Sequence, residues 1–99
     1  MKRIKELVEH IDEELCGAKQ YAEMYVERKA DDDTSWANRF HGMAEDELKH
    51  AEYIHEYAMM EINRIGTIFK APAEMQEKWD KAHKKYVDKA AWIRLMLTM

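Results

Sequence analysis

The chain has 99 residues, with 16 lysines and arginines against 20 aspartates and glutamates, and a formal net charge of -4. A chain of this length accommodates one domain, so we expect a single domain over residues 1–99. The apolar fraction of 46% is too high for an intrinsically disordered protein. The acidic balance disfavours a general nucleic-acid-binding function.

The composition also limits the expected cellular setting. The longest apolar runs are four residues long, at 57–60 and 90–93, which predicts neither a transmembrane helix nor a signal-peptide core. The single cysteine, Cys16, excludes an intramolecular disulfide and a multi-cysteine zinc site. We therefore expect a cytoplasmic protein without a membrane partner.

The residues favour an all-α fold. Good helix formers dominate, and three glycines and one proline are too few to punctuate a sheet. We predict helices over about 3–30, 35–65 and 73–97. The run of turn and N-cap residues at 31–35 separates the first two helices, which should form a long antiparallel hairpin. Gly66 is predicted as the C-cap of the second helix, and Pro72 as the opening of the third.

The first predicted helix has an apolar seam at alternating steps of three and four residues, and one position in this seam is charged. The seam comprises Ile4, Leu7, Ile11, Glu14, Ala18, Tyr21 and Tyr25. A carboxylate among apolar side chains loses hydration, which is unfavourable unless a cation or hydrogen-bond donors compensate. Glu14 is therefore a candidate metal ligand. The alternatives are a glutamate at the seam edge that reaches solvent, or one paired with an arginine.

The second predicted helix has two more polar residues in its seam. This seam comprises Trp36, Phe40, Met43, Glu47, His50, Ile54, Tyr57, Glu61 and Ile65. Glu47 and His50 lie one turn apart on the same helix face, so both can bind one cation. A second Glu-x-x-His pair, Glu52 and His55, lies off the seam and is predicted on a flank without a metal role. Glu61 is expected where the seam becomes exposed to solvent.

The geometry of a hairpin provides a further test. Residues equidistant from the centre of the turn lie at the same height in an antiparallel pair. With the centre at residue 32, Glu14 is level with His50, and with the centre at 30.5 it is level with Glu47. The two seams and the height therefore agree, and we predict that Glu14, Glu47 and His50 are metal ligands.

These residues resemble the ferritin-like superfamily, which contains rubrerythrins, bacterioferritins and encapsulated ferritins. The resemblance rests on Glu14, on Tyr21 seven residues later, and on the segment 44–52 around Glu47 and His50, and it covers about residues 4–60. In that family, such residues are ligands of a di-iron carboxylate centre inside a four-helix bundle. The resemblance implies that Glu14 binds or bridges iron, that Glu47 bridges, and that His50 is a terminal ligand.

The chain carries only half of the family's ligand set. The seam of the third predicted helix has no carboxylate and comprises Met75, Trp79, Ala82, Tyr86, Ala90, Ile93 and Leu97. A homodimer, or a higher homo-oligomer, would supply the second half and complete a four-helix ferritin-like bundle. Two copies of Glu14, Glu47 and His50 would then hold two irons per dimer, with four carboxylates balancing two divalent ions. Manganese and zinc are alternative metals.

The resemblance implies a ferroxidase-type oxidoreductase, in which Glu14, Glu47 and His50 are also the catalytic residues that support oxidation of Fe(II). The alternative is a non-catalytic helical interaction protein, for instance of phage or prophage origin, that retains the fold without the activity. A weaker hypothesis is an adaptor whose basic third helix binds an acidic partner. Solvated i,i+4 ion pairs such as Glu74–Lys78 explain the same charges.

Overall fold

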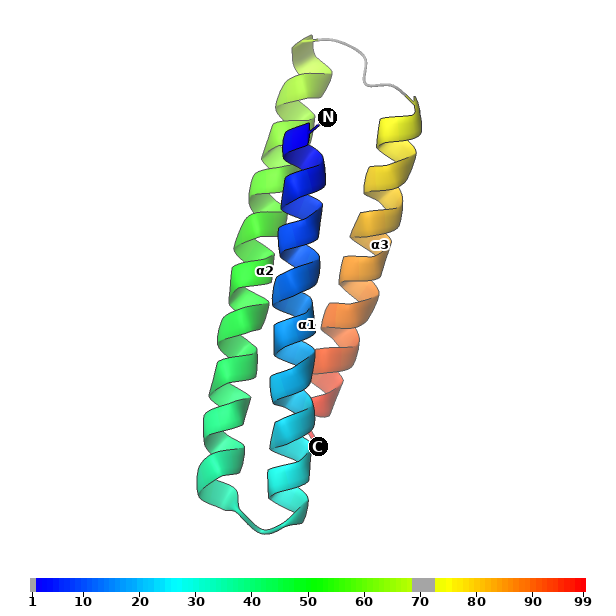
Figure 1. Cartoon of the computed structure of the whole chain (residues 1–99). Helices are drawn as coiled ribbons and strands as arrows, with labels where there is room; N and C mark the ends of the chain where they lie inside the picture. Colours follow the sequence, from blue (N-terminus) through cyan, green and yellow to red (C-terminus); the bar gives the residue numbers. More distant parts are fainter. Residues whose placement is uncertain (1, 69–72) are drawn as a thin grey trace.

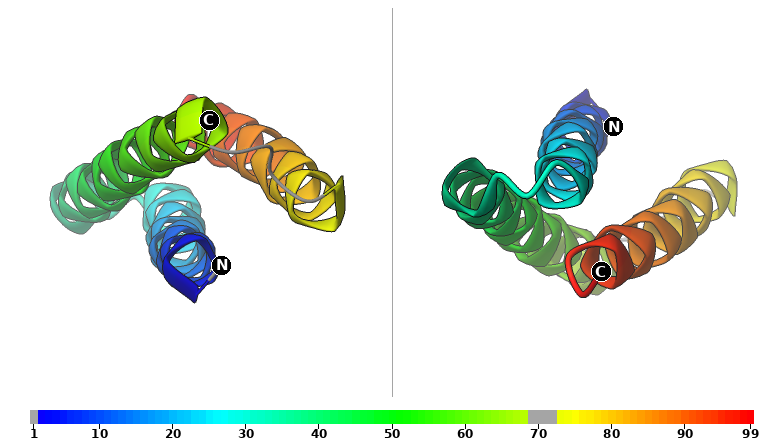
Figure 2. Two further views of the ribbon diagram at one scale, coloured as in Figure 1. Left: turned by 90° about the horizontal axis from the view of Figure 1, so that it is seen from above. Right: turned by 90° about the horizontal axis from the view of Figure 1, so that it is seen from below.

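The computed structural model describes residues 2–68 and 73–99, which form three α-helices (Figure 1). α1 (Lys2–Ala30) and α2 (Thr34–Ile68) form a long antiparallel hairpin, and α3 (Ala73–Met96) runs beside it. Seen end-on, the three helices lie at the corners of a triangle (Figure 2). The all-α prediction is confirmed, and the helix bounds agree with the predicted ranges to within three residues. Within the described ranges, no helix combines the length and apolarity needed to cross a membrane.

Aspartates build the turn between α1 and α2, as the sequence predicted. Asp32 has a left-handed φ of 59°, a conformation that aspartate adopts more readily than most residues. The main-chain NH groups of Asp32 and Asp33 donate hydrogen bonds back to the carbonyls of Lys29 and Arg28. Oδ1 of Asp33 accepts a hydrogen bond from the NH of Trp36 at 3.3 Å, so Asp33 is the N-cap of α2.

The predicted role of Gly66 as the C-cap of the second helix is wrong. α2 continues through Gly66 to Ile68, and Gly66 does not have a positive φ. A C-cap glycine normally adopts the left-handed conformation. Gly66 is therefore an ordinary, weakly helix-forming residue inside α2. The predicted role of Pro72 falls outside the described residues.

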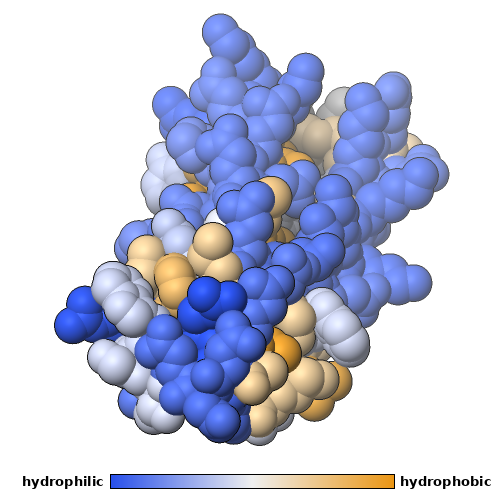
Figure 3. All heavy atoms as spheres, turned by 60° about the horizontal axis from the view of Figure 1, so that its bottom comes forward, coloured by the Kyte–Doolittle hydropathy of each residue, from blue (hydrophilic) through white to orange (hydrophobic). Residues whose placement is uncertain are grey.

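Small side chains contribute much of the contact between α1 and α2. The fully buried alanines of these two helices are Ala18, Ala22, Ala44, Ala51 and Ala58. Leu15 and Leu48 are buried beside them, whereas other large side chains lie at the edges of the contact. Trp36, Met43 and Tyr57, which were predicted in the buried seam of the second helix, are 39–47% exposed. That part of the seam prediction is wrong. Figure 3 shows hydrophobic residues exposed among hydrophilic ones on the face that it draws.

α3 buries the side of its helix that the sequence predicted, including Trp79 and Ile93. Its C-terminal end is held by groups from the other two helices. Nζ of Lys29 donates a hydrogen bond to the main-chain oxygen of Met99, and Nε2 of His41 lies 3.0 Å from the carbonyl oxygen of Leu97. Towards its beginning α3 diverges from α1 (Figure 1), leaving a groove of about 510 Å³ between the first turns of the two helices.

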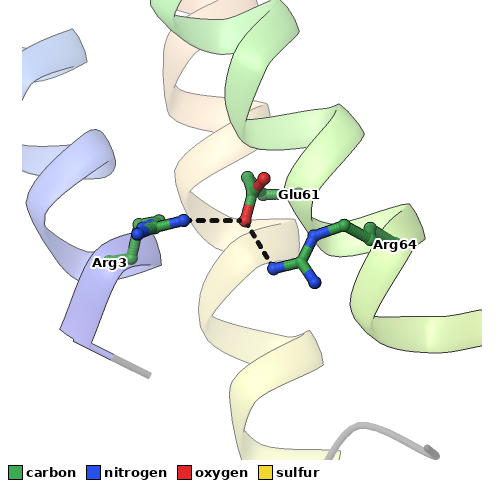
Figure 4. Close-up of polar contacts among 3 residues, drawn as sticks. All are labelled: Arg3, Glu61 and Arg64. Carbon is green, nitrogen blue, oxygen red and sulfur yellow. Dashed lines mark hydrogen bonds and ion pairs between the residues drawn. The ribbon is translucent and has the colours of Figure 1, made fainter. Parts of the chain in front are cut away.

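A group of three charged residues joins the beginning of α1 to α2 (Figure 4). Oε2 of Glu61 lies 3.5 Å from Nη1 of Arg3 and 2.9 Å from Nη2 of Arg64. The hydrogen bond from Arg64, together with the charges of both arginines, lowers the pKa of the Glu61 carboxyl. The side chain of Glu61 is only 13% exposed. The prediction that Glu61 lies where the seam becomes solvent-exposed is therefore wrong, because the two arginines cover its carboxylate.

His55 lies off the predicted seam, on a flank of α2, and it is buried there against α3. The residue is 8% exposed, its ring stacks on Tyr86 with centroids 4.2 Å apart, and its Nε2 lies 2.8 Å from Nδ1 of His83. The predicted flank is therefore the side of α2 that α3 covers. Glu52, three residues before His55, remains exposed and forms an ion pair with Arg94 of α3. Burial, and then the nearby His83, lower the pKa of His55.

We expect acidification to destabilise the protein through His55. Because the pKa of His55 in the folded protein lies below its ordinary value of about 6.5, the unfolded chain binds the proton more readily. The free energy of unfolding should therefore fall as the pH drops from about 6.5 through the lowered pKa. Urea unfolding between about pH 5 and 8 measures this dependence.

The variant His55→Phe retains an aromatic ring against Tyr86 but cannot titrate, so its unfolding free energy should depend less steeply on pH. His10, whose side chain is 63% exposed, provides the control, because His10→Gln should keep the wild-type pH dependence. The same slope in His55→Phe as in the wild type would contradict the assignment to His55.

Candidate metal centre

Glu14, Glu47 and His50 come together in the α1–α2 hairpin. One ligand atom from each side chain lies within 4.8 Å of the other two. Nδ1 of His50 is 3.5 Å from Oε2 of Glu14 and 3.8 Å from Oε1 of Glu47. The proximity predicted from the height of these residues in the hairpin is therefore confirmed. Within residues 2–68 and 73–99, this is the single group of three or more His, Cys, Asp or Glu side chains so arranged.

Buried neighbours in the sequence fix the direction of these three side chains. Leu15 of α1 is 1% exposed, and Leu48 and Ala51 of α2 are 6% and 0% exposed. Because these apolar residues occupy the centre of the helix contact, the polar residues adjacent to them are placed at its edge. The side chains of Glu14 and Glu47 are accordingly 26% and 28% exposed, and that of His50 is 54% exposed. The site is thus partly desolvated but accessible.

The candidate centre lies on the face of the hairpin that α3 leaves open. α3 forms ion pairs with Asp12 of α1 and with Glu52 of α2. Each of these two acids is two positions away from a residue of the centre, and two residues turn an α-helix by about 200°. α3 therefore packs on the opposite side of the hairpin. The open face carries Met43 and Tyr57, which are 39% and 46% exposed.

The two carboxylates disfavour each other's charge. A hydrogen bond with Glu14 raises the pKa of the Glu47 carboxyl, and burial and the negative charges of Glu14 and Asp46 act in the same direction, whereas His50 opposes them. In the absence of a cation, the pair therefore holds a proton more tightly than an isolated glutamate does. A divalent cation would replace that proton and balance both carboxylates.

The donor set fits a transition metal. Carboxylate oxygens and a neutral imidazole nitrogen are ligands for iron, manganese and zinc. Glu14 offers its carboxylate from α1. Glu47 offers a carboxylate and His50 an imidazole nitrogen from one turn of α2. Tyr21, which contributes to the ferritin-like resemblance, stacks on Phe40 with ring centroids 6.4 Å apart. Its ring therefore packs across the hairpin against α2.

Gly17, which lies one turn beyond Glu14 on α1, was not predicted from the sequence to contact the site. A Cβ atom at this position would lie 3.0 Å from Oε2 of Glu47. The signal in the sequence was a glycine inside a long helix, where it costs about 1 kcal/mol relative to alanine. Gly17 does not have a positive φ, so the backbone conformation does not account for this glycine.

Comparisons of the chain with known protein families, with curated proteins and with solved structures find no match. The geometry of the three side chains and the pattern in the sequence are therefore the basis for a function.

We expect Glu14→Gln to stabilise the metal-free protein at pH 7. The amide removes one of two adjacent negative charges and still hydrogen-bonds to Glu47, so the free energy of unfolding should rise by roughly 0.5–1 kcal/mol, the range of partly exposed charge pairs. Urea unfolding in the presence of a chelator measures this change. Glu13, whose side chain is 76% exposed, is the matched control, and Glu13→Gln should have little effect. Destabilisation by Glu14→Gln would show that the two carboxylates do not repel each other.

Proposed function

We propose that this protein binds divalent metal through Glu14, Glu47 and His50, and that two copies together form a di-iron carboxylate centre that oxidises Fe(II). The observation that carries the proposal is the convergence of the three side chains, whose ligand atoms lie within 4.8 Å of one another. A glutamate from one helix and a Glu-x-x-His from the next is the ligand set of half a ferritin-like centre. The ferritin-like resemblance of the sequence supports the same interpretation.

The number of ligands favours a site shared between two subunits. One chain offers two carboxylates and one imidazole, whereas a di-iron centre of this class uses four carboxylates and two imidazoles. The open face of the hairpin suits a second copy, because it combines the candidate centre with the exposed side chains of Met43 and Tyr57. Two hairpins packed through this face would form a four-helix bundle with the ligands inside. Four carboxylates would then balance two divalent ions.

Iron would supply the redox chemistry, since each Fe(II) gives up one electron to dioxygen or peroxide and becomes Fe(III). The carboxylates of Glu14 and Glu47 favour this change because their negative charge stabilises the more highly charged ion. His50 binds as the neutral imidazole, so metal and proton compete for its nitrogen. Packing by a second copy would exclude water and strengthen each of these electrostatic interactions. Manganese or zinc would bind the same donors.

We expect one metal ion per chain and two per dimer after anaerobic loading with Fe(II). Native mass spectrometry, combined with elemental analysis, measures mass and metal content together. Glu47→Ala and His50→Ala should lose the bound metal and slow Fe(III) formation on exposure to air, because each removes a ligand. Glu13→Ala, at an exposed position beside Glu14, should retain both. If the wild type binds no stoichiometric Fe(II), Mn(II) or Zn(II), the non-catalytic interaction protein becomes the better interpretation.

If two subunits share the site, a substitution that prevents dimerisation should also weaken metal binding. Met43 lies one turn before Glu47 on the open face and is 39% exposed. Met43→Lys places a charge in the proposed interface without removing a ligand, so we expect a monomer by light scattering and weaker binding of Mn(II). The control is Trp92→Lys on α3, where Trp92 is 51% exposed away from that face. Unchanged mass and affinity in Met43→Lys would contradict a dimer built through this face.

A further inference from the structure

Gly17 occupies a position where the helix itself gives no reason for glycine. It lies in the interior of α1 (Lys2–Ala30), and its φ is not positive. Alanine would adopt the same backbone conformation and is a far better helix former. The backbone conformation therefore does not require glycine at this position.

The carboxylate of Glu47 fills the space in which a side chain at position 17 would begin. A Cβ atom built on Gly17 would lie 3.0 Å from Oε2, 3.5 Å from Cδ and 3.7 Å from Cγ of Glu47. The shortest of these distances is tighter than most Cβ contacts in proteins, and it could be accommodated only if the carboxylate shifted by a few tenths of an ångström. A methyl group at position 17 would therefore have to displace the end of the Glu47 side chain.

The orientation of Glu47 makes this displacement relevant to metal binding. Oε2 of Glu47 lies against α1 beside Gly17, while Oε1 faces Nδ1 of His50 at 3.8 Å. A carboxylate oxygen of Glu47 also lies within 4.8 Å of one of Glu14. Moving Oε2 away from α1 would consequently change the distances from Glu47 to both of the other proposed ligands.

Among the glycines of the chain, Gly17 alone has such a close contact. A Cβ atom at Gly42 of α2 would have no neighbour within 4 Å, and Gly42 likewise does not have a positive φ. The two glycines therefore differ in one respect: a side chain at position 42 enters open space, and a side chain at position 17 enters the space of the Glu47 carboxylate.

We infer that Gly17 is a positioning residue of the metal centre, which leaves room for the carboxylate of Glu47 to lie against α1 beside Glu14. This inference rests on the proposed function, and it adds a residue that contacts no metal itself. Residues that orient a metal ligand typically change metal affinity by about 10–100-fold when they are replaced.

The pair of variants Gly17→Ala and Gly42→Ala tests the inference. Both replace glycine by a better helix former, so neither should lower the Tm of the metal-free protein. Gly17→Ala should weaken the binding of Mn(II), followed by electron paramagnetic resonance, by about tenfold or more. Gly42→Ala should bind Mn(II) as the wild type does. A merely structural role for Gly17 would change stability and affinity in the same direction, and wild-type affinity in Gly17→Ala would overturn the inference.

A second measurement on metal-free protein separates this inference from the proposed function. In a Glu47→Ala background the carboxylate is absent, so Gly17→Ala should raise the Tm by more than it does in the wild type. Gly42→Ala should raise the Tm equally in both backgrounds. Equal gains for Gly17→Ala in the two backgrounds would overturn the contact between Gly17 and Glu47. A wild type that binds no Mn(II) would instead overturn the proposed function and, with it, the metal role of Gly17.

Discussion

The close approach of α1 and α2 is the constraint on which the candidate centre depends. Fully buried alanines such as Ala18 and Ala44 form the contact between the two helices, so carboxylates at its edge are brought close together. Glu14 and Glu47 consequently raise the cost of charging one another, as the raised pKa of Glu47 indicates. Two adjacent carboxylates are unfavourable without a cation, and for the same reason they are suited to binding one. In the proposed metal site, affinity for metal and a lower stability of the metal-free protein would therefore have the same origin.

Most of the fold could be predicted from the sequence, because strong local signals mark it. The aspartates around Asp33 define the turn, and helix-forming residues on either side leave little alternative to a hairpin. The buried side of α2 was harder to predict. Large residues such as Trp36 and Met43 were predicted in the seam, but alanines, together with Leu48, occupy the buried side of α2. The continuation of α2 through Gly66 was missed because a sequence does not reveal the φ angle of a glycine.

The candidate centre was predictable to the extent that it depends on the hairpin alone. A uniform rise per residue fixes the height at which Glu14 meets α2, and the structure places it beside Glu47 and His50. His55 could not be predicted in the same way, because its burial depends on which side of α2 is covered by α3. The contact between Gly17 and Glu47 likewise depends on the separation of two helices, which spacing along one helix does not determine.

α3 is bound to the other two helices more firmly at its C-terminal end than at its beginning. Groups from Lys29 and His41 lie within hydrogen-bond distance of the main-chain oxygens of Met99 and Leu97, directly after the end of α3, whereas the first turns of α3 diverge from α1 beside a groove. Local unfolding begins where such attachments are fewest. Fluctuations of α3 should therefore start near Met75 and expose the His55 side of α2 to water. The face that holds Glu14 points away from α3, so these excursions leave the pair of helices around the candidate centre intact.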